Sequence, residues 1–135
     1  GAVVTQAAPG GGMDSHESPR RDALPPALRF RFQALELALE AVVRLRAPIR
    51  KIRAQDRELG DQLRDALTHA CTALGEGDGR RGGNQRLAFR RAIGEAREAR
   101  GRLATAYVKR YVSLAEITPG AEKLLEVERI LARFV

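Results

Sequence analysis

The chain has 135 residues, the length of one domain, and carries 24 Lys and Arg against 17 Asp and Glu, a net charge of +7. This charge favours acidic partners, with nucleic acid first, but it says nothing about the fold. One cysteine excludes an internal disulfide framework and a cysteine-based zinc site, and the sequence has no run of 18 apolar residues that would span a membrane. Because no basic segment followed by an apolar one opens the chain, we expect a cytoplasmic protein.

Residues 1–27 are predicted to be a disordered tail. They hold several glycines and prolines and few residues that could form a core. We leave open whether residues 1–12 are native or whether the native chain begins at Met13. The tail has more acidic than basic side chains, so the basic character belongs to the predicted domain, residues 28–135.

The first predicted helix runs from Leu28 to Ala47, because apolar residues recur there at helical spacing. Its apolar arc is wider than one seam of a bundle needs, so this helix is either central or also buried by another subunit. Pro48 is expected to kink or end it. The expected core face consists of Leu28, Phe32, Leu35, Leu39 and Val42.

A run of basic residues without an acidic one surrounds Pro48. It has two interpretations: a solvated helix end with cations near its C-terminus, or a second phosphate-facing patch. The residues are Arg44, Arg46, Arg50, Lys51 and Arg53.

The second predicted helix runs from Asp56 to Leu74. Gly75 or Gly77 is expected to cap its end in the left-handed conformation. His69 lies off the apolar stripe and has no second ligand near it in the sequence, so we interpret it as a boundary residue and not as a metal or catalytic group. The stripe consists of Leu59, Leu63, Ala66, Leu67, Ala70 and Leu74.

The glycine-rich stretch from Gly75 to Asn84 must separate two helices, with Asn84 as the N-cap of the second one. Three interpretations of this stretch stay open. Its backbone N–H groups could cradle a phosphate, although the G-x-x-x-x-G-K-[ST] pattern is missing. Its arginines could bind a nucleic-acid backbone, or Glu76 could pair with an arginine and fix the turn.

The third predicted helix runs from Gln85 to Tyr111. Ten basic and two acidic residues occur between Arg80 and Arg110, which indicates a long basic stripe beside the core face. Aromatic residues for base stacking are nearly absent from the stripe, so binding to nucleic acid is expected to be electrostatic. The candidate nucleic-acid-binding residues are Arg80, Arg81, Arg86, Arg90, Arg97 and Arg100. The expected core face is Ala88, Phe89, Ala92, Ala96, Ala99, Leu103, Ala106 and Tyr107.

The fourth predicted helix opens at Thr118-Pro119, an N-cap followed by proline at the first helical position, and reaches the last residue. Its core face consists of Leu124, Val127, Leu131, Phe134 and Val135. Four helices with short connections and no strand pattern predict an all-α, up-down-up-down antiparallel four-helix bundle.

No arrangement of residues that carries out chemistry is recognisable in the sequence. The predicted helices contain no second histidine, no Cys/His pair and no Glu-x-x-His, and their acidic residues lie mostly off the apolar stripes. We therefore expect a non-catalytic protein without a metal or cofactor.

Several motifs resemble the four-helix-bundle proteins encoded in 23S rRNA intervening sequences. They are Leu35-Glu-Leu-Ala-Leu-Glu40, Asp61-Gln-Leu-Arg-Asp-Ala66, Gly75-Glu-Gly-Asp-Gly-Arg-Arg81, Phe89-Arg90 and Gly94-Glu-Ala-Arg-Glu98. The resemblance covers about Leu28 to Val135. The loop motif of the family reads E-G-x-G-R, and Glu76, Gly77, Gly79 and Arg80 match it.

The resemblance implies a bundle that assembles into a homo-oligomer. The accessory variability proteins of diversity-generating retroelements, a basic branch of this family, form pentameric rings and associate with a reverse transcriptase and with nucleic acid. By resemblance we expect a pentamer that binds RNA or DNA and partners a reverse transcriptase. The alternatives are a protein–protein adaptor, whose arginines meet an acidic partner, and a passive structural ring without a ligand.

Overall fold

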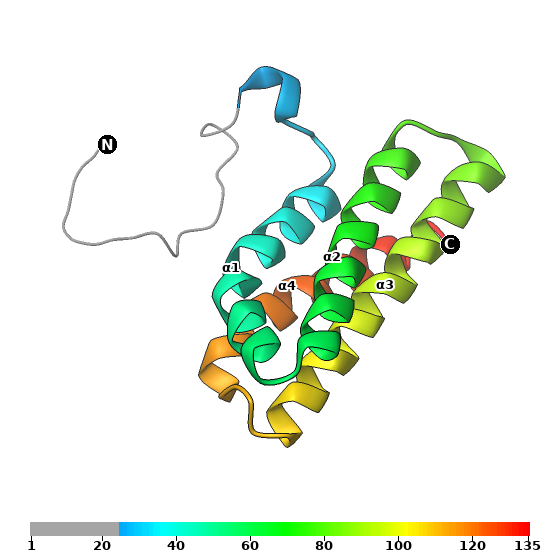
Figure 1. The fold of residues 1–135 in the computed structure, drawn as a ribbon. Coiled ribbons are helices and arrows are strands. Elements are labelled where there is room, and N and C mark those ends of the chain that lie inside the picture. Colours follow the sequence, from blue (N-terminus) through cyan, green and yellow to red (C-terminus); the bar gives the residue numbers. More distant parts are fainter. Residues whose placement is uncertain (1–24) are drawn as a thin grey trace.

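A computed structural model describes residues 25–135 (Figure 1). Within this range the chain forms four α-helices and one short 3-10 helix, and no strand. The all-helical prediction is therefore confirmed for the described residues. Most of the predicted tail, including Met13, lies outside them. The 3-10 helix η2 (Pro26–Leu28) has no buried residue, and Leu28 is 54% exposed, so its assignment to the first helix and its core face was wrong.

Helix α1 (Gln33–Gln55) continues through Pro48 instead of ending there. A proline inside a helix has no N–H to donate to the carbonyl four residues earlier, here that of Arg44. This cost is offset because Pro48 itself and the two isoleucines that follow it, Ile49 and Ile52, are all buried. Of the predicted core face, Leu35 is buried and the other helical members are half-buried: Leu39 and Val42.

Helix α2 (Arg57–Asp78) begins after Asp56, whose side chain accepts a hydrogen bond from the N–H of Leu59 at 3.1 Å. The helix does not end at Gly75 or Gly77, so both predicted caps were wrong; its C-cap is Gly79, with a φ of −89°. The predicted apolar stripe is confirmed, because all six of its members are buried: Leu59, Leu63, Ala66, Leu67, Ala70 and Leu74.

Gly77 is needed for packing and not for ending the helix. A Cβ added to it would lie 2.4 Å from a ring carbon of Phe89, which is fully buried on α3. The ring of Phe89 also stacks on Phe32, with centroids 5.2 Å apart, and meets Phe134 edge-on at 5.4 Å. Phe89 and Phe32 thus belong to the core at the end of the molecule where α2 connects to α3, and Phe134 packs against them while staying 44% exposed.

Helix α3 (Gly82–Val108) begins before Asn84, so the predicted N-cap was wrong; the observed N-cap, Arg81, makes no side-chain cap. Gly82 has a φ of +61°, a left-handed conformation that glycine adopts without strain. Tyr107 is 42% exposed, which contradicts its assignment to the core. The rest of the predicted core face is buried: Ala88, Phe89, Ala92, Ala96, Ala99, Leu103 and Ala106.

Helix α4 (Leu114–Leu131) begins before the predicted start at Thr118-Pro119. Ser113 and Glu116 form a capping box, in which each side chain binds the other residue's N–H. This box satisfies two backbone donors and fixes the start, so Pro119 lies inside the helix. Three predicted core residues are buried, Leu124, Val127 and Leu131, whereas Phe134 and Val135 are 44% and 43% exposed and lie beyond the helix end.

The helices pack in a closed order, in which α1 and α3 each contact both α2 and α4 (Figure 1). The connection between α2 and α3 lies at the opposite end of the molecule from the other two connections. These contacts are compatible with the predicted up-down-up-down arrangement. Among the described helices, none combines the length and the apolar character that a membrane crossing requires.

Candidate nucleic-acid interface

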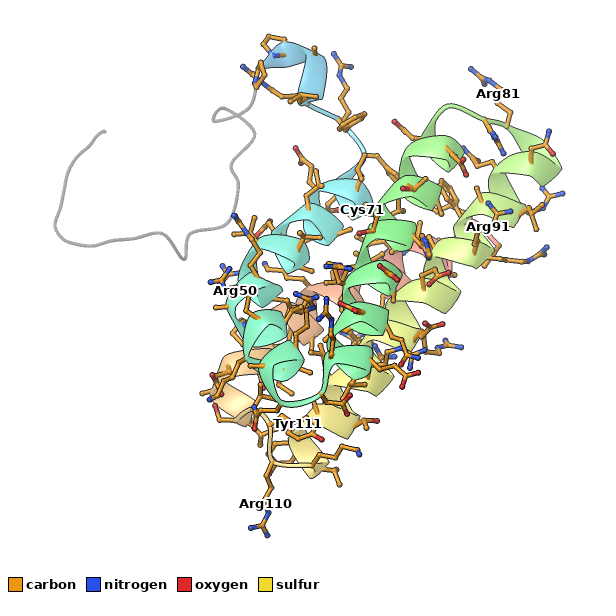
Figure 2. All side chains as sticks on the ribbon, in the orientation of Figure 1. Arg50, Cys71, Arg81, Arg91, Arg110 and Tyr111 are labelled. Atoms are coloured by element: carbon orange, nitrogen blue, oxygen red, sulfur yellow. The ribbon has the colours of Figure 1, made fainter. Side chains whose placement is uncertain are left out.

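Four of the six predicted nucleic-acid-binding residues lie at the end where α2 connects to α3. Arg80 and Arg81 belong to the connection, and Arg86 and Arg90 follow one helical turn apart on α3. All four are exposed, and none of them forms an ion pair with another residue in the range 25–135. Figure 2 shows Arg81 at the outer tip of this end. We call these four residues the loop-end arginines.

The loop motif holds this connection in place. Glu76 pairs with Arg91, Oε1 to Nη1, at 3.4 Å, so the predicted pairing of Glu76 with an arginine is confirmed, although its partner is not a loop-end arginine. The side chain of Gln85 donates to the carbonyls of Gly77 at 3.1 Å and Arg80 at 2.9 Å. Together with the close contact of Gly77 and Phe89, these bonds fix the turn. The side chains of the loop-end arginines take no part in them.

The other two predicted residues, Arg97 and Arg100, meet a buried carboxylate. Glu128 on α4 is 6% exposed and accepts hydrogen bonds from Arg97 Nε at 3.2 Å and Arg100 Nη2 at 2.9 Å, and Arg100 Nε also binds it. The hydrogen bond to Glu128 raises the pKa of Arg100 above its ordinary value. The six arginines therefore do not form one row of free cations: the side chain of Arg100 is 32% exposed and that of Arg97 is 70% exposed.

Glu128 is the residue that reasoning from the sequence missed. It lies four residues after Leu124 and three before Leu131, so it occupies the apolar face of α4. A carboxylate at such a position needs a cationic partner from another helix, because burying an unpaired charge is costly. That spacing was the signal that could have revealed it.

The basic residues around Pro48 divide into paired and unpaired groups. Lys51 Nζ lies 3.2 Å from Glu116, and Arg53 Nε lies 2.6 Å from Asp61. The remaining three are exposed and form no ion pair with any residue from 25 to 135; we call them the α1 arginines, Arg44, Arg46 and Arg50. The second basic patch suggested by the sequence thus reduces to three cations on the outer surface of α1.

Residues that could support other chemistry are dispersed. His69 is 62% exposed and its Nδ1 lies 3.8 Å from Glu95. Cys71 is half-buried, and burial raises the pKa of its thiol to about 11, which disfavours the reactive thiolate. Among the residues that the structure describes, no three His, Cys, Asp or Glu side chains form a group that could hold a metal ion.

Comparison of the chain with protein-family models, with curated proteins and with solved structures gives no match. The resemblance to the proteins of 23S rRNA intervening sequences therefore stays a prediction from the motifs quoted above.

Proposed function

We propose that the chain is a non-catalytic scaffold, an up-down-up-down antiparallel four-helix bundle that binds RNA or DNA through the loop-end arginines. The observation that carries this proposal is the presence of four exposed arginines without a carboxylate partner in the described chain. Two lie on a connection that packing and hydrogen bonds fix, and two lie on the first turns of α3. A nucleic-acid backbone is recognised by cations at fixed positions, and a fixed site loses little conformational entropy when it binds.

The assembly of the scaffold is proposed to be a homo-oligomer, a pentamer by the family resemblance, which partners a reverse transcriptase. The wide apolar arc that suggested a subunit contact on α1 gives little support, because its large residues are buried or half-buried within one chain. Exposed apolar side chains near the connection of α3 and α4 support a contact better: Tyr107, Val108 and Leu114 are 42%, 76% and 53% exposed. Light scattering that gives a 14.8 kDa monomer at micromolar concentration would contradict the oligomer.

A second candidate function is binding of an acidic protein surface at the same place. Leu87 is 54% exposed and lies next to Arg86 on α3. An exposed leucine among arginines suits a protein partner, because protein interfaces combine an apolar centre with a charged rim.

The test is binding of RNA and DNA oligonucleotides at two salt concentrations, with the double variant Arg86→Glu/Arg90→Glu. A matched control, Lys109→Glu/Arg110→Glu, makes the same change in net charge near the opposite end, where Figure 2 shows Arg110. We expect wild type and control to bind at low salt and the loop-end variant to lose affinity. If wild type fails to bind at low salt, or if both variants lose affinity equally, the nucleic-acid proposal is wrong and the acidic-partner function takes its place.

A further inference from the structure

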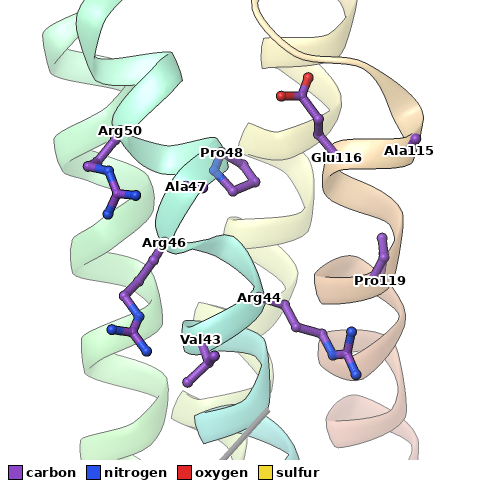
Figure 3. A pocket seen from close by; sticks show the side chains of 9 residues that line it. All are labelled: Val43, Arg44, Arg46, Ala47, Pro48, Arg50, Ala115, Glu116 and Pro119. Atoms are coloured by element: carbon purple, nitrogen blue, oxygen red, sulfur yellow. The ribbon is translucent and has the colours of Figure 1, made fainter. Parts of the chain in front are cut away.

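The outer surface of α1 carries a second basic feature, a hollow of about 560 Å³ between α1 and the start of α4. All three α1 arginines line it (Figure 3). Arg46 and Arg50 lie on one side of Pro48, and Arg44 lies on the other side, toward α4. The hollow is therefore flanked by cations on both sides, which a simple solvated helix face does not require.

The charge of this hollow is not balanced within the described chain. Its one lining carboxylate, Glu116, is already bound: Lys51 Nζ lies 3.2 Å away, and the N–H of Ser113 donates to Glu116 Oε1 at 2.8 Å. The α1 arginines form no ion pair among residues 25–135. An anion over Pro48 would thus have Arg44 on one side and Arg46 and Arg50 on the other (Figure 3), and guanidinium groups bind phosphate oxygens in a planar, often bidentate geometry.

The wall of the hollow also offers polar backbone groups, because two in-helix prolines face it. Pro48 and Pro119 have no N–H, so the carbonyls of Arg44 and Ala115, four residues earlier, lack their usual helical donors. Both of these residues line the hollow. Ala115 also lies in the first turn of α4, where backbone N–H groups have no acceptor within the helix and the helix dipole favours a negative charge.

The remaining surface of the hollow is apolar: Val43, Ala47, Pro48 and Pro119. The volume falls in the range of about 300–1,000 Å³ that small-molecule sites have. A ligand that suits this hollow has an anionic part for the arginines and a flatter, less polar part for the apolar floor.

We infer that this hollow binds a nucleotide, with its phosphates between the α1 arginines and its base and sugar over Val43 and Ala47. The same chemistry is offered by a free nucleoside triphosphate and by the triphosphate-bearing 5′ end of an RNA strand. The site is separate from the loop-end arginines, so this inference does not depend on the proposed function.

The test uses calorimetric titration of the full chain with ATP, inorganic tripolyphosphate and adenosine. We expect ATP to bind more tightly than tripolyphosphate, because the floor adds contacts, and adenosine to bind weakest. The variant Arg44→Gln/Arg50→Gln should lower ATP affinity at least about tenfold, whereas Arg80→Gln/Arg81→Gln, which removes the same charge elsewhere, should leave it unchanged. Ala47→Leu should weaken ATP more than tripolyphosphate. Circular dichroism confirms that each variant is folded.

To distinguish a free nucleotide from an RNA 5′ end as the ligand, binding is compared for two RNAs of the same sequence. One carries a 5′-triphosphate and the other a 5′-hydroxyl. If a strand end is the ligand, the triphosphate RNA binds more tightly and Arg44→Gln/Arg50→Gln removes only that preference. If a free nucleotide is the ligand, ATP binds and the two RNAs bind equally. The inference is overturned if neither ATP nor triphosphate RNA binds at low salt, if both arginine variants lose ATP affinity equally, or if poly-glutamate binds more tightly than ATP.

Discussion

The beginning and the middle of α3 each carry two arginines on one side of the helix. Arg86 and Arg90 are exposed and have no carboxylate partner in the described chain, whereas Arg97 and Arg100 bind Glu128 on α4. The residue type and the helix do not distinguish the two regions, and the two spacings, four residues and three residues, both place a pair on one side of a helix. Helix α4 distinguishes the two regions, because it places the buried carboxylate of Glu128 opposite the middle of α3 and no buried carboxylate opposite its beginning. An internal carboxylate partner offsets the charge that a cation can offer to a ligand, so the beginning of α3 offers more free charge than its middle.

The largest expected effect comes from removing the carboxylate that separates the two regions. Glu128→Gln leaves Arg100, which is about one-third exposed, without its counter-charge. We expect the free energy of unfolding to fall by about 2–3 kcal/mol, less than for a fully buried pair because solvent screens part of the charge. Urea unfolding measures this change. Glu122→Gln, an exposed site on the same helix, is the matched control, and an equal loss in both variants would show that Glu128 has no special role.

The next effect tests whether packing holds the loop-end region in place. Gly77→Ala would bring a Cβ to 2.4 Å from the buried ring of Phe89, so we expect a loss of about 1–2 kcal/mol in the free energy of unfolding. Gly94→Ala, on the outer surface of α3 where nothing lies within 4 Å, should instead gain about 0.5–1 kcal/mol. Thermal unfolding of both variants measures the difference, and the same sign for both would contradict the packing account.

An arginine with a different, purely conformational role lies just beyond the end of α3. Arg110 has a φ of 65°, and the hydrogen bonds from Arg110 N to Tyr107 O and from Tyr111 N to Ala106 O, both 2.9 Å, form a Schellman motif. Glycine is normal at this position, so Arg110→Gly should raise the free energy of unfolding by about 0.5–1 kcal/mol. Lys109→Gly, at a residue with a φ of −78°, is the control and should not be stabilising. A stability loss in Arg110→Gly would mean that its side chain matters to the fold.

The smallest expected change in stability concerns Cys71. This residue packs against the core cluster that contains Phe89, at the end of the molecule where α2 connects to α3. Burial raises its thiol pKa from the ordinary 9.0 to about 11, so the folded state holds this proton more tightly than the unfolded state. Its contribution to stability is complete below pH 9 and is lost as the pH rises toward 11. The difference in unfolding free energy between wild type and Cys71→Ala, followed from pH 8 to pH 11, should show this decline. A difference that does not change with pH would contradict it.

The thiol also provides a control for the binding experiments. It should react slowly with an aromatic disulfide reagent near neutral pH in the native protein and fully after denaturation. Slow labelling in Arg86→Glu/Arg90→Glu would show that the core around Cys71 stays packed in this variant. A loss of nucleic-acid affinity would then be due to the change in charge and not to unfolding. Fast labelling in the native wild type would contradict the burial of Cys71.

The sequence predicted the parts of this fold that depend on local pattern. The apolar stripe of α2 and the alanine-rich face of α3 follow from helical spacing alone, because each repeats several times along one helix. The exception on α3 was Tyr107, which lies at the helix end, where fewer neighbouring residues are available to cover it.

The incorrect predictions concern features that depend on contacts between residues far apart in the sequence. Pro48 and Pro119 interrupt hydrogen bonding locally, at a cost of about 3 kcal/mol each, but apolar packing on both sides keeps their helices continuous. Gly77 is a typical helix end by composition, and only its contact with the ring of Phe89 on another helix shows that glycine is present there for packing. The expectation of one row of six free arginines was wrong for the same reason, since the partner of Arg97 lies 31 residues away in Glu128.

The most direct test of the central claim compares salt dependence in two matched double variants, Arg86→Gln/Arg90→Gln and Arg97→Gln/Arg100→Gln. Both remove two positive charges from α3, and both are measured with a labelled single-stranded RNA at a temperature where circular dichroism shows them folded. Each lost phosphate contact lowers the slope of log affinity against log salt by about 0.7 for a single strand, so the first variant should lower it by about 1.4. The second should lower the slope by no more than about 0.7, because the single negative charge of Glu128 offsets one of the two cations that it binds. Equal slope changes in both variants, or a change only in the second, would contradict the division of α3 into a ligand-binding beginning and an internally paired middle.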